Sequence, residues 1–244
     1  GTWTNAENMN VARAGHTAST LANGYVLVTG GVKNNAALNS AELYNPATGT
    51  WTTTRNMNVA RAAHTASRLA DEYLLVAGGW DGSAALNSAE LYSSATGTWT
   101  ITGNMNVARY HHTTTTLANG LVLVTGGFHI DVGILNSAEL YNPLTGTWTT
   151  TGKMNTARSY HTASILGNGY VLVAGGRDGS AELYNPSTGT WTTTGYMNTA
   201  RYYHTASTLA SGYVLAAGGW DGSAELYNPS TGTWIITANM TAGR

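Results

Sequence analysis

Histidine, arginine and glutamate, three residue types that can support chemistry, recur at fixed positions along this 244-residue chain. The recurring histidines, each followed by threonine, are His16, His64, His112, His161 and His204. Imidazole is a common metal ligand, so these side chains could ring a central channel and bind a metal ion. However, a five-fold ring suits no common metal, and no carboxylate accompanies each histidine to orient it. We therefore expect packing or a backbone hydrogen bond to explain the histidines, with no metal site and no cofactor.

One arginine and one glutamate also recur in each copy, in segments that are otherwise apolar or small. The arginines are Arg13, Arg61, Arg109, Arg158 and Arg201, and the glutamates are Glu42, Glu90, Glu139, Glu182 and Glu225. Five acid–base sites would be unusual in one enzyme, and long charged side chains are rarely buried unpaired. The pattern therefore predicts a partly buried Arg–Glu ion pair of bidentate geometry, within or between repeats.

The composition excludes several classes of function. The net charge of -1 gives no electrostatic support for binding nucleic acid or an anionic membrane. There are no cysteines, which excludes disulfides, thiolate metal sites and cysteine nucleophiles. No apolar run approaches the ~18 residues of a membrane span. Low charge, absent cysteine and Thr/Asn-rich segments are similar in style to bacterial extracellular repeat proteins, which favours an extracellular or cell-surface location.

The whole chain is built from repeats. The sequence Gly-Thr-Trp recurs at intervals of 43 to 49 residues, ending at Trp3, Trp51, Trp99, Trp148, Trp191 and Trp234. Repeats of this length stack, because no single unit can bury its apolar face alone. We therefore expect one domain over residues 1–244, with repeats at 5–54, 55–102, 103–151, 152–194 and 195–237. Residues 1–4 and 238–244 would be ring-closing or surplus ends.

Each repeat is predicted to be a four-stranded antiparallel meander. In the second copy we expect strands at residues 64–69, 73–77, 88–92 and 98–101, from alternating or continuous apolar runs. The first two strands are joined by Asn-Gly in three other copies, a strong hairpin signal. Asn-Pro-x-Thr-Gly, as at residues 45–49, is typical of the turn between the last two strands.

Two further motifs carry a resemblance to a known family. A Gly-Gly doublet closes each second strand, and a tyrosine precedes the repeat tryptophan by seven residues. The doublets begin at Gly30, Gly78, Gly126, Gly175 and Gly218, and the tyrosines are Tyr44, Tyr92, Tyr141, Tyr184 and Tyr227. This constellation resembles kelch-repeat β-propellers of the bacterial type. The resemblance implies an all-β propeller around a central channel, and the five copies of the first three strands favour five four-stranded antiparallel blades.

The number of blades has an alternative. Six Gly-Thr-Trp strands accompany five copies of the other strands, so a six-bladed incomplete ring is also compatible with the sequence. With five blades, one tryptophan strand is surplus to ring closure. Such a strand could add an edge that pairs with another molecule, which would allow self-association.

Differences between the copies gather at one end of the blades. In an antiparallel meander, the loop between strands two and three and the link to the next blade share one end, here termed the link face. The opposite end, the turn face, carries the Asn-Gly hairpins and Asn-Pro turns, which vary little. Candidate ligand-binding residues on the link face are Trp80, Asp81, Tyr110, His111, Phe128, His129, Tyr160, Arg177, Asp178, Tyr202, Tyr203, Trp220 and Asp221. Asp81, Asp178 and Asp221 precede glycine, so turn formation is the preferred interpretation for them.

Aromatic side chains beside polar ones on a rigid scaffold favour ligand recognition. We expect a non-catalytic binding or scaffold module that holds a protein or glycan on the link face. One alternative is an isomerase or hydrolase using His111, His129, Asp131 or Asp178, although no nucleophile, base and orienting group have recognisable spacing. The radical copper oxidases among kelch-type propellers need a Cys–Tyr link, which this chain lacks. A third alternative is a structural repeat segment or a self-associating ring.

Overall fold

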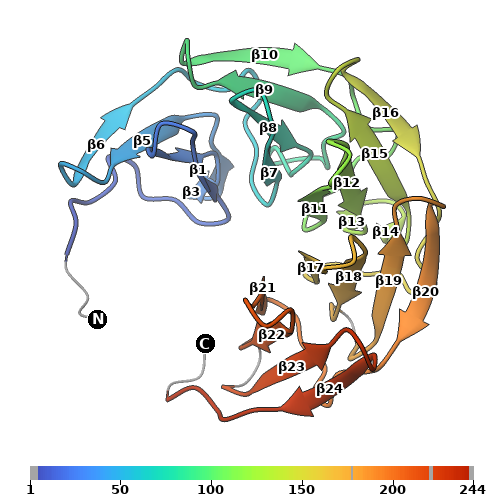
Figure 1. Ribbon diagram of the computed structural model, residues 1–244. Coiled ribbons are helices and arrows are strands. Elements are labelled where there is room, and N and C mark those ends of the chain that lie inside the picture. The colour runs from blue at the N-terminus through green and yellow to red at the C-terminus, as the bar shows by residue number, and fades with distance from the viewer. Residues whose placement is uncertain (1–4, 177, 220–221, 242–244) are drawn as a thin grey trace. The chain divides into compact units, whose positions relative to one another are not determined.

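The computed structural model describes residues 5–176, 178–219 and 222–241, which form strands and turns and no helix (Figure 1). Five of its sheets have four antiparallel strands each, and each such sheet is one repeat. The chain is therefore an all-β protein of the β-propeller class with five blades, which confirms the five-blade prediction over the six-blade alternative. The expected surplus strand at residues 2–4 lies outside the described residues. The described part of the chain also contains no helix long and apolar enough to cross a membrane.

The strands of the blades are short, with four or five residues each. Blade 1 contains β1 (Thr17–Thr20), β2 (Val26–Thr29), β5 (Ala41–Asn45) and β6 (Thr50–Thr53). Blade 2 contains β7 (Thr65–Arg68), β8 (Tyr73–Ala77), β9 (Ala89–Ser93) and β10 (Thr98–Thr102). Blade 3 contains β11 (Thr113–Thr116), β12 (Val122–Thr125), β15 (Ala138–Asn142) and β16 (Thr147–Thr150). Blade 4 contains β17 (Thr162–Ile165), β18 (Val171–Ala174), β19 (Ala181–Asn185) and β20 (Thr190–Thr194), and blade 5 contains β21 (Thr205–Thr208), β22 (Val214–Ala217), β23 (Ala224–Asn228) and β24 (Thr233–Ile236).

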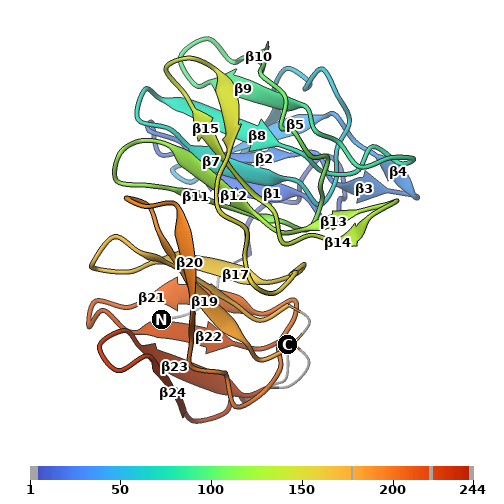
Figure 2. The same ribbon diagram turned by 90° about the vertical axis from the view of Figure 1, so that its right-hand side faces the viewer.

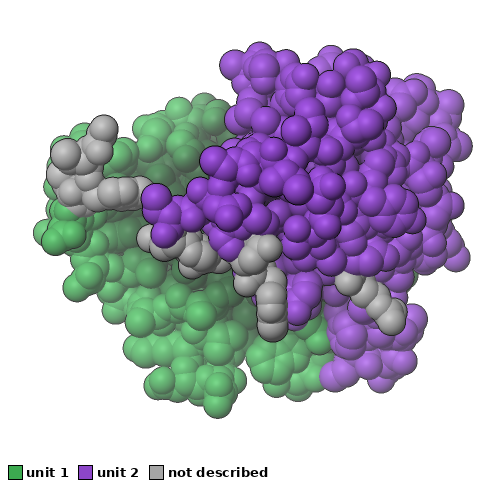
Figure 3. Space-filling view, turned by 90° about the horizontal axis from the view of Figure 1, so that it is seen from below, with its two compact units in different colours: residues 1–110, 143–147 green, residues 111–142, 148–244 purple. Residues whose placement is uncertain are grey.

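The chain divides into two compact units, which Figure 3 colours separately. Unit 1, residues 1–110 and 143–147, holds blades 1 and 2, whose first strands β1 and β7 contact each other. Unit 2, residues 111–142 and 148–244, holds blades 3, 4 and 5, where β17 contacts both β11 and β21. Within each unit, consecutive blades therefore pack through their first strands.

The apolar core lies between neighbouring blades rather than inside any one of them. In unit 1, Leu27 of β2 belongs to the same buried cluster as Met57 and Leu74 of the following repeat. In unit 2, Leu123 of β12 joins Val171 of β18 in the same way. This is the physical reason for the repeat pattern, because a lone blade would leave one apolar sheet face in water. The second strands β12 and β18 are buried along their whole length, as their unbroken apolar sequence predicts.

The recurring tyrosine and tryptophan fix the outer edge of each blade. Tyr184 of β19 and Trp191 of β20 are directly paired across the sheet, with ring centroids 4.9 Å apart. The Trp191 indole Nε1 donates a hydrogen bond to the Gly152 carbonyl at 2.7 Å, in the link that enters blade 4. The same bond joins Trp234 to Gly195 at 2.9 Å. In blades 4 and 5 the fourth strand therefore holds the link that enters its own blade.

Two small hairpins extend the loops between strands two and three. In unit 1, β3 (Val32–Lys33) pairs with β4 (Ala36–Ala37) beyond the sheet of blade 1 (Figure 2). In unit 2, β13 (Phe128–His129) pairs with β14 (Gly133–Ile134) beyond the sheet of blade 3. The first hairpin turns through Asn34 and Asn35, both with positive φ (50° and 62°), which two asparagines tolerate. The amino-acid sequence does not predict these hairpins, because each strand is only two residues long.

Candidate functional site

The candidate residues that the structure brings together most closely are His111, Tyr160 and Tyr203 in unit 2, here termed the inner aromatic stack. The His111 and Tyr160 ring centroids lie 3.9 Å apart, and those of Tyr160 and Tyr203 lie 4.2 Å apart. Each residue immediately precedes a repeat histidine, at the start of the first strand of its blade. Three successive blades thus place one aromatic ring each in a continuous stack on the link face of unit 2.

The backbone at these positions is left-handed in every repeat. His111, Tyr160 and Tyr203 have φ values of 53°, 56° and 60°. In unit 1, Gly15 and Ala63 occupy the equivalent positions with φ values of 64° and 51°. Bulky residues rarely adopt this conformation, which costs on the order of 1–3 kcal/mol per residue. The conformation was not predicted, although Gly15 in the first repeat was a signal for it.

Hydrogen bonds between blades hold these strained residues in place. The Tyr160 amide donates to the His111 carbonyl at 3.1 Å, and the Tyr203 amide donates to the Tyr160 carbonyl at 3.3 Å. In unit 1 the Ala63 amide donates to the Gly15 carbonyl at 2.8 Å. The backbone thus fixes the direction in which each aromatic side chain leaves the blade.

The stack presents an open, uncharged end. The Tyr203 side chain is 65% exposed, whereas His111 and Tyr160 are half-buried. Burial lowers the pKa of His111 to about 4, so its imidazole is neutral at pH 7. Tyr202 adds a second ring 5.9 Å from that of Tyr203. Tyr110, in unit 1, is half-buried, and burial raises the pKa of its phenol.

Phe128 and His129 lie on the same end of blade 3 as His111, because β12 runs toward the link face and ends just before them. Phe128 pairs with Ile134 across the β13–β14 hairpin and is half-buried. The His129 Nδ1 atom accepts a hydrogen bond of 3.2 Å from the Asp131 amide. The Asp131 carboxylate is 3.9 Å from that ring nitrogen and largely exposed. These residues form a raised rim on blade 3.

The candidate aspartates hold turns. The Asp81 Oδ1 atom accepts hydrogen bonds of 2.8 Å from both the Ser83 and Ala84 amides, and these bonds lower the pKa of its carboxyl. Trp80 is half-buried and forms isolated antiparallel bridges to Ala62 and Ala85. The Asp178 carboxylate accepts bonds from the amide and hydroxyl of Ser180 and lies 3.9 Å from Arg158. Three other candidates, Arg177, Trp220 and Asp221, lie outside the described residues.

The repeat Arg–Glu pairs are buried, but the predicted bidentate geometry is wrong in four of them. The Arg158 Nη2 atom reaches Glu182 Oε1 at 3.0 Å, while Nη1 donates to the Gly175 and Ser180 carbonyls. Glu182 Oε2 instead accepts the amide and side-chain nitrogens of Asn155, at 2.7 and 2.8 Å. The donors of the guanidinium are shared between the carboxylate and the carbonyls, because the buried backbone carbonyls also need hydrogen-bond donors. The Nη2–Oε1 contact recurs in three other pairs, which are Arg13–Glu42, Arg61–Glu90 and Arg201–Glu225.

Three of the repeat histidines, His64, His161 and His204, form hydrogen bonds to threonines of the preceding blade. His64 is buried, and its Nε2 atom lies 2.9 Å from the Thr17 hydroxyl and 3.2 Å from the Thr29 hydroxyl of blade 1. The burial of His64 is what the packing interpretation expects, and its Nε2 atom bonds to threonine side chains. Within the described ranges, no three histidine, aspartate or glutamate side chains are grouped so that they could hold a metal ion.

The five blades, the glycine doublets and the paired tyrosines and tryptophans together define a β-propeller of kelch type. The KLHDC2/KLHL20/DRC7 Kelch-repeats domain model matches residues 2–176, and the Kelch motif matches residues 157–198 and 200–241. The chain belongs to the kelch-repeat family. Kelch β-propellers are typically protein-interaction scaffolds. No curated protein matches the chain.

Proposed function

We propose that this propeller is a non-catalytic binding module that recognises a protein segment on its link face, with the inner aromatic stack as the anchor. The observation that carries the proposal is the largely exposed Tyr203 ring, which rests on Tyr160 at 4.2 Å. Aromatic side chains lose little conformational entropy on binding and dominate many interaction hot spots.

The pre-ordered backbone supports this proposal. The left-handed conformation of His111, Tyr160 and Tyr203 costs free energy, and such strain concentrates at functional sites. Unit 1 has glycine and alanine at the same positions, so the scaffold itself does not need aromatic rings there. A ligand that binds the stack does not have to order it first, which reduces the entropic cost of association.

The chemistry of the stack favours an apolar or aromatic side chain of a protein partner. His111 is neutral at pH 7, and Asp81 and Asp178 are committed to turns. Phe128 and His129 would contact the residues of the partner that flank its anchor. Because a glycan can also stack on tyrosine, both ligand classes belong in the test.

Purified protein can be screened against a peptide library and a glycan array. Tyr203→Ala should reduce the affinity for selected peptides about 30-fold, the loss typical of a hot-spot residue. Alanine is compatible with this backbone position because Ala63 occupies it in blade 2. Tyr196→Ala is the matched control, since Tyr196 is 70% exposed in the same link and should leave binding unchanged. Binding to glycans alone, or equal peptide affinity in both variants, would contradict the proposal.

A further inference from the structure

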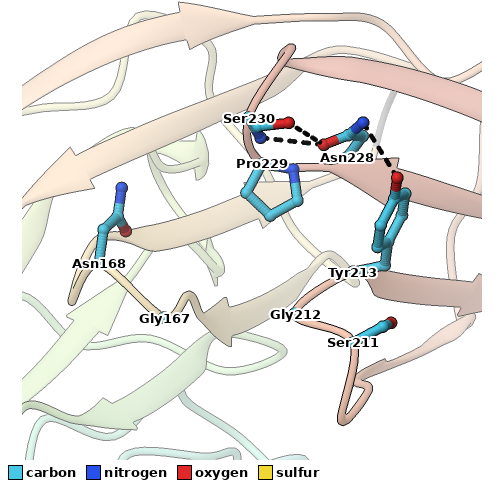
Figure 4. Close-up of a pocket in the computed structure, with 8 residues that line it drawn as sticks. All are labelled: Gly167, Asn168, Ser211, Gly212, Tyr213, Asn228, Pro229 and Ser230. Carbon is cyan, nitrogen blue, oxygen red and sulfur yellow. Dashed lines mark hydrogen bonds between the residues drawn. The ribbon is translucent and has the colours of Figure 1, made fainter.

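A pocket of about 390 Å³ opens at the turn face of blades 4 and 5, both in unit 2 (Figure 4). Gly167 and Asn168 line it from the β17–β18 hairpin, Ser211 and Tyr213 from the β21–β22 hairpin, and Pro229 from the β23–β24 turn. In Figure 4, Asn168 stands on one side, opposite Pro229 and Tyr213. The volume is within the range of about 300–1,000 Å³ that is typical of small-molecule sites.

Two departures from the repeat coincide at this pocket. The position of Gly167 is alanine in every other blade, at Ala22, Ala70, Ala118 and Ala210. The position of Ser211 is asparagine or aspartate in every other blade, at Asn23, Asp71, Asn119 and Asn168. Both replacements shorten the side chain, and both residues line the same space. Side chains of the size found in the other repeats would therefore occupy space that Gly167 and Ser211 leave at this pocket.

Hydrogen bonds among the lining residues hold the polar wall of the pocket in place. The Asn228 Nδ2 atom donates to the Tyr213 hydroxyl at 3.2 Å, which fixes the tyrosine ring. The Asn228 Oδ1 atom accepts bonds from the amide and hydroxyl of Ser230, at 3.0 and 2.7 Å. The Asn168 Oδ1 atom accepts the Tyr170 amide at 3.1 Å, so its NH₂ group remains available to a ligand.

The lining contains amides, hydroxyls and two rings but no charged side chain. An ionic ligand would lose hydration here without a counter-charge, which disfavours it. A neutral ligand with several hydroxyl groups fits better, because its C–H face can lie against Tyr213 and Pro229 while its hydroxyls bond to Asn168 and Ser211. We propose that this pocket is a binding site for one neutral sugar residue.

The proposal can be tested by titrating ¹⁵N-labelled protein with the methyl β-glycosides of glucose, galactose and N-acetylglucosamine. At least one of the three should cause saturable chemical-shift changes in the Gly167, Asn168, Ser211 and Gly212 amides. No saturable change with any of the three would overturn the proposal.

Two substitutions taken from other repeats locate the site without threatening the fold. In Gly167→Ala the new Cβ would meet no protein atom within 4 Å, so it would extend into open space at the pocket and weaken binding about tenfold. Tyr213→Leu copies Leu121 of blade 3 and should abolish the saturable changes. Ala118→Gly, the reverse change in blade 3, is the control and should leave the affinity unaltered. Equal affinity in wild type and Gly167→Ala would also overturn the proposal. The peptide experiments on Tyr203 test the opposite face independently.

Discussion

The Nε2 atom of His64 lies 2.9 Å from the hydroxyl of Thr17, which belongs to the first strand of the preceding blade. Equivalent bonds join His161 to Thr113 at 3.0 Å and His204 to Thr162 at 2.9 Å. Burial, with a smaller contribution from the Arg61 charge, lowers the pKa of His64 to about 3. Burial and the Arg201 charge lower the pKa of His204 to about 4. At neutral pH these two histidines therefore join their blades as neutral imidazoles.

The first prediction is a loss of stability on mild acidification. The unfolded chain binds a proton at each histidine below about pH 6.5, whereas folded His64 and His204 stay neutral until about pH 3 and about pH 4. Because the unfolded state binds more protons in this window, the free energy of unfolding falls as pH decreases from 6.5 toward 4. At about pH 5, His64 and His204 should each contribute a loss of about 2 kcal/mol.

Urea unfolding across this pH window measures the effect. His204→Gln removes one titrating group while retaining a hydrogen-bonding side chain, so its stability should depend less steeply on pH than that of the wild type. An unchanged pH slope in this variant would refute the histidine explanation.

The second prediction concerns the buried Arg158–Glu182 pair. Glu182→Leu should destabilise unit 2 by about 3–5 kcal/mol, because it leaves the buried Arg158 charge without its partner. Glu72→Leu, at an exposed hairpin position, is the control and should change stability by less than about 0.5 kcal/mol. Denaturant unfolding of both variants checks this. A small effect of Glu182→Leu would mean that the backbone carbonyls alone stabilise the guanidinium.

The third prediction separates backbone strain from packing at the glycine doublets. Gly175 and Gly169 both have positive φ, at 72° and 82°. A Cβ on Gly175 would lie 2.7 Å from His204 Cε1, whereas one on Gly169 would meet nothing within 4 Å. Gly169→Ala should therefore cost only about 1–2 kcal/mol of backbone strain, and Gly175→Ala about 1–3 kcal/mol more. Thermal unfolding with equal losses in the two variants would disprove the close-packing role of the doublet.

The fourth prediction is that relieving the strain next to a repeat histidine stabilises the protein. Ala63 has a φ of 51° where the first repeat has Gly15. Ala63→Gly should raise stability by about 0.5–1 kcal/mol, the strain relieved less the added entropy of the unfolded chain. Ala70→Gly, at an exposed position without positive φ, should instead lower stability by about 0.5–1 kcal/mol. The same sign for both variants in denaturant unfolding would contradict the strain argument.

Most of the fold was predictable because its signals are local and occur five times. The strand at Tyr73–Ala77 coincides with its apolar run, and the Asn23-Gly24 turn has the positive φ expected at its glycine. The two-residue hairpin β13–β14 was not predictable, because so short a strand has no readable periodicity.

The candidate site was only partly predictable. The aromatic character of His111, Tyr160 and Tyr203 was visible as a departure from the repeat, but their stacking depends on a left-handed backbone that only Gly15 signalled. The bidentate Arg–Glu geometry was wrong because sequence does not show which carbonyls compete for the guanidinium. At the turn face, Gly167 and Ser211 are departures too small to stand out until the structure places them at one pocket.

The placement of the core between neighbouring blades has a consequence for synthesis on the ribosome. Leu27 needs only the repeat that contains Leu74, and Leu123 needs only the one that contains Val171, so each apolar layer is complete once a single further repeat has emerged. Domains generally fold as units during synthesis, N-terminal segments first. The growing chain can therefore bury its apolar surface one layer at a time. At any moment, only the most recently synthesised blade lacks the following blade that covers its apolar face.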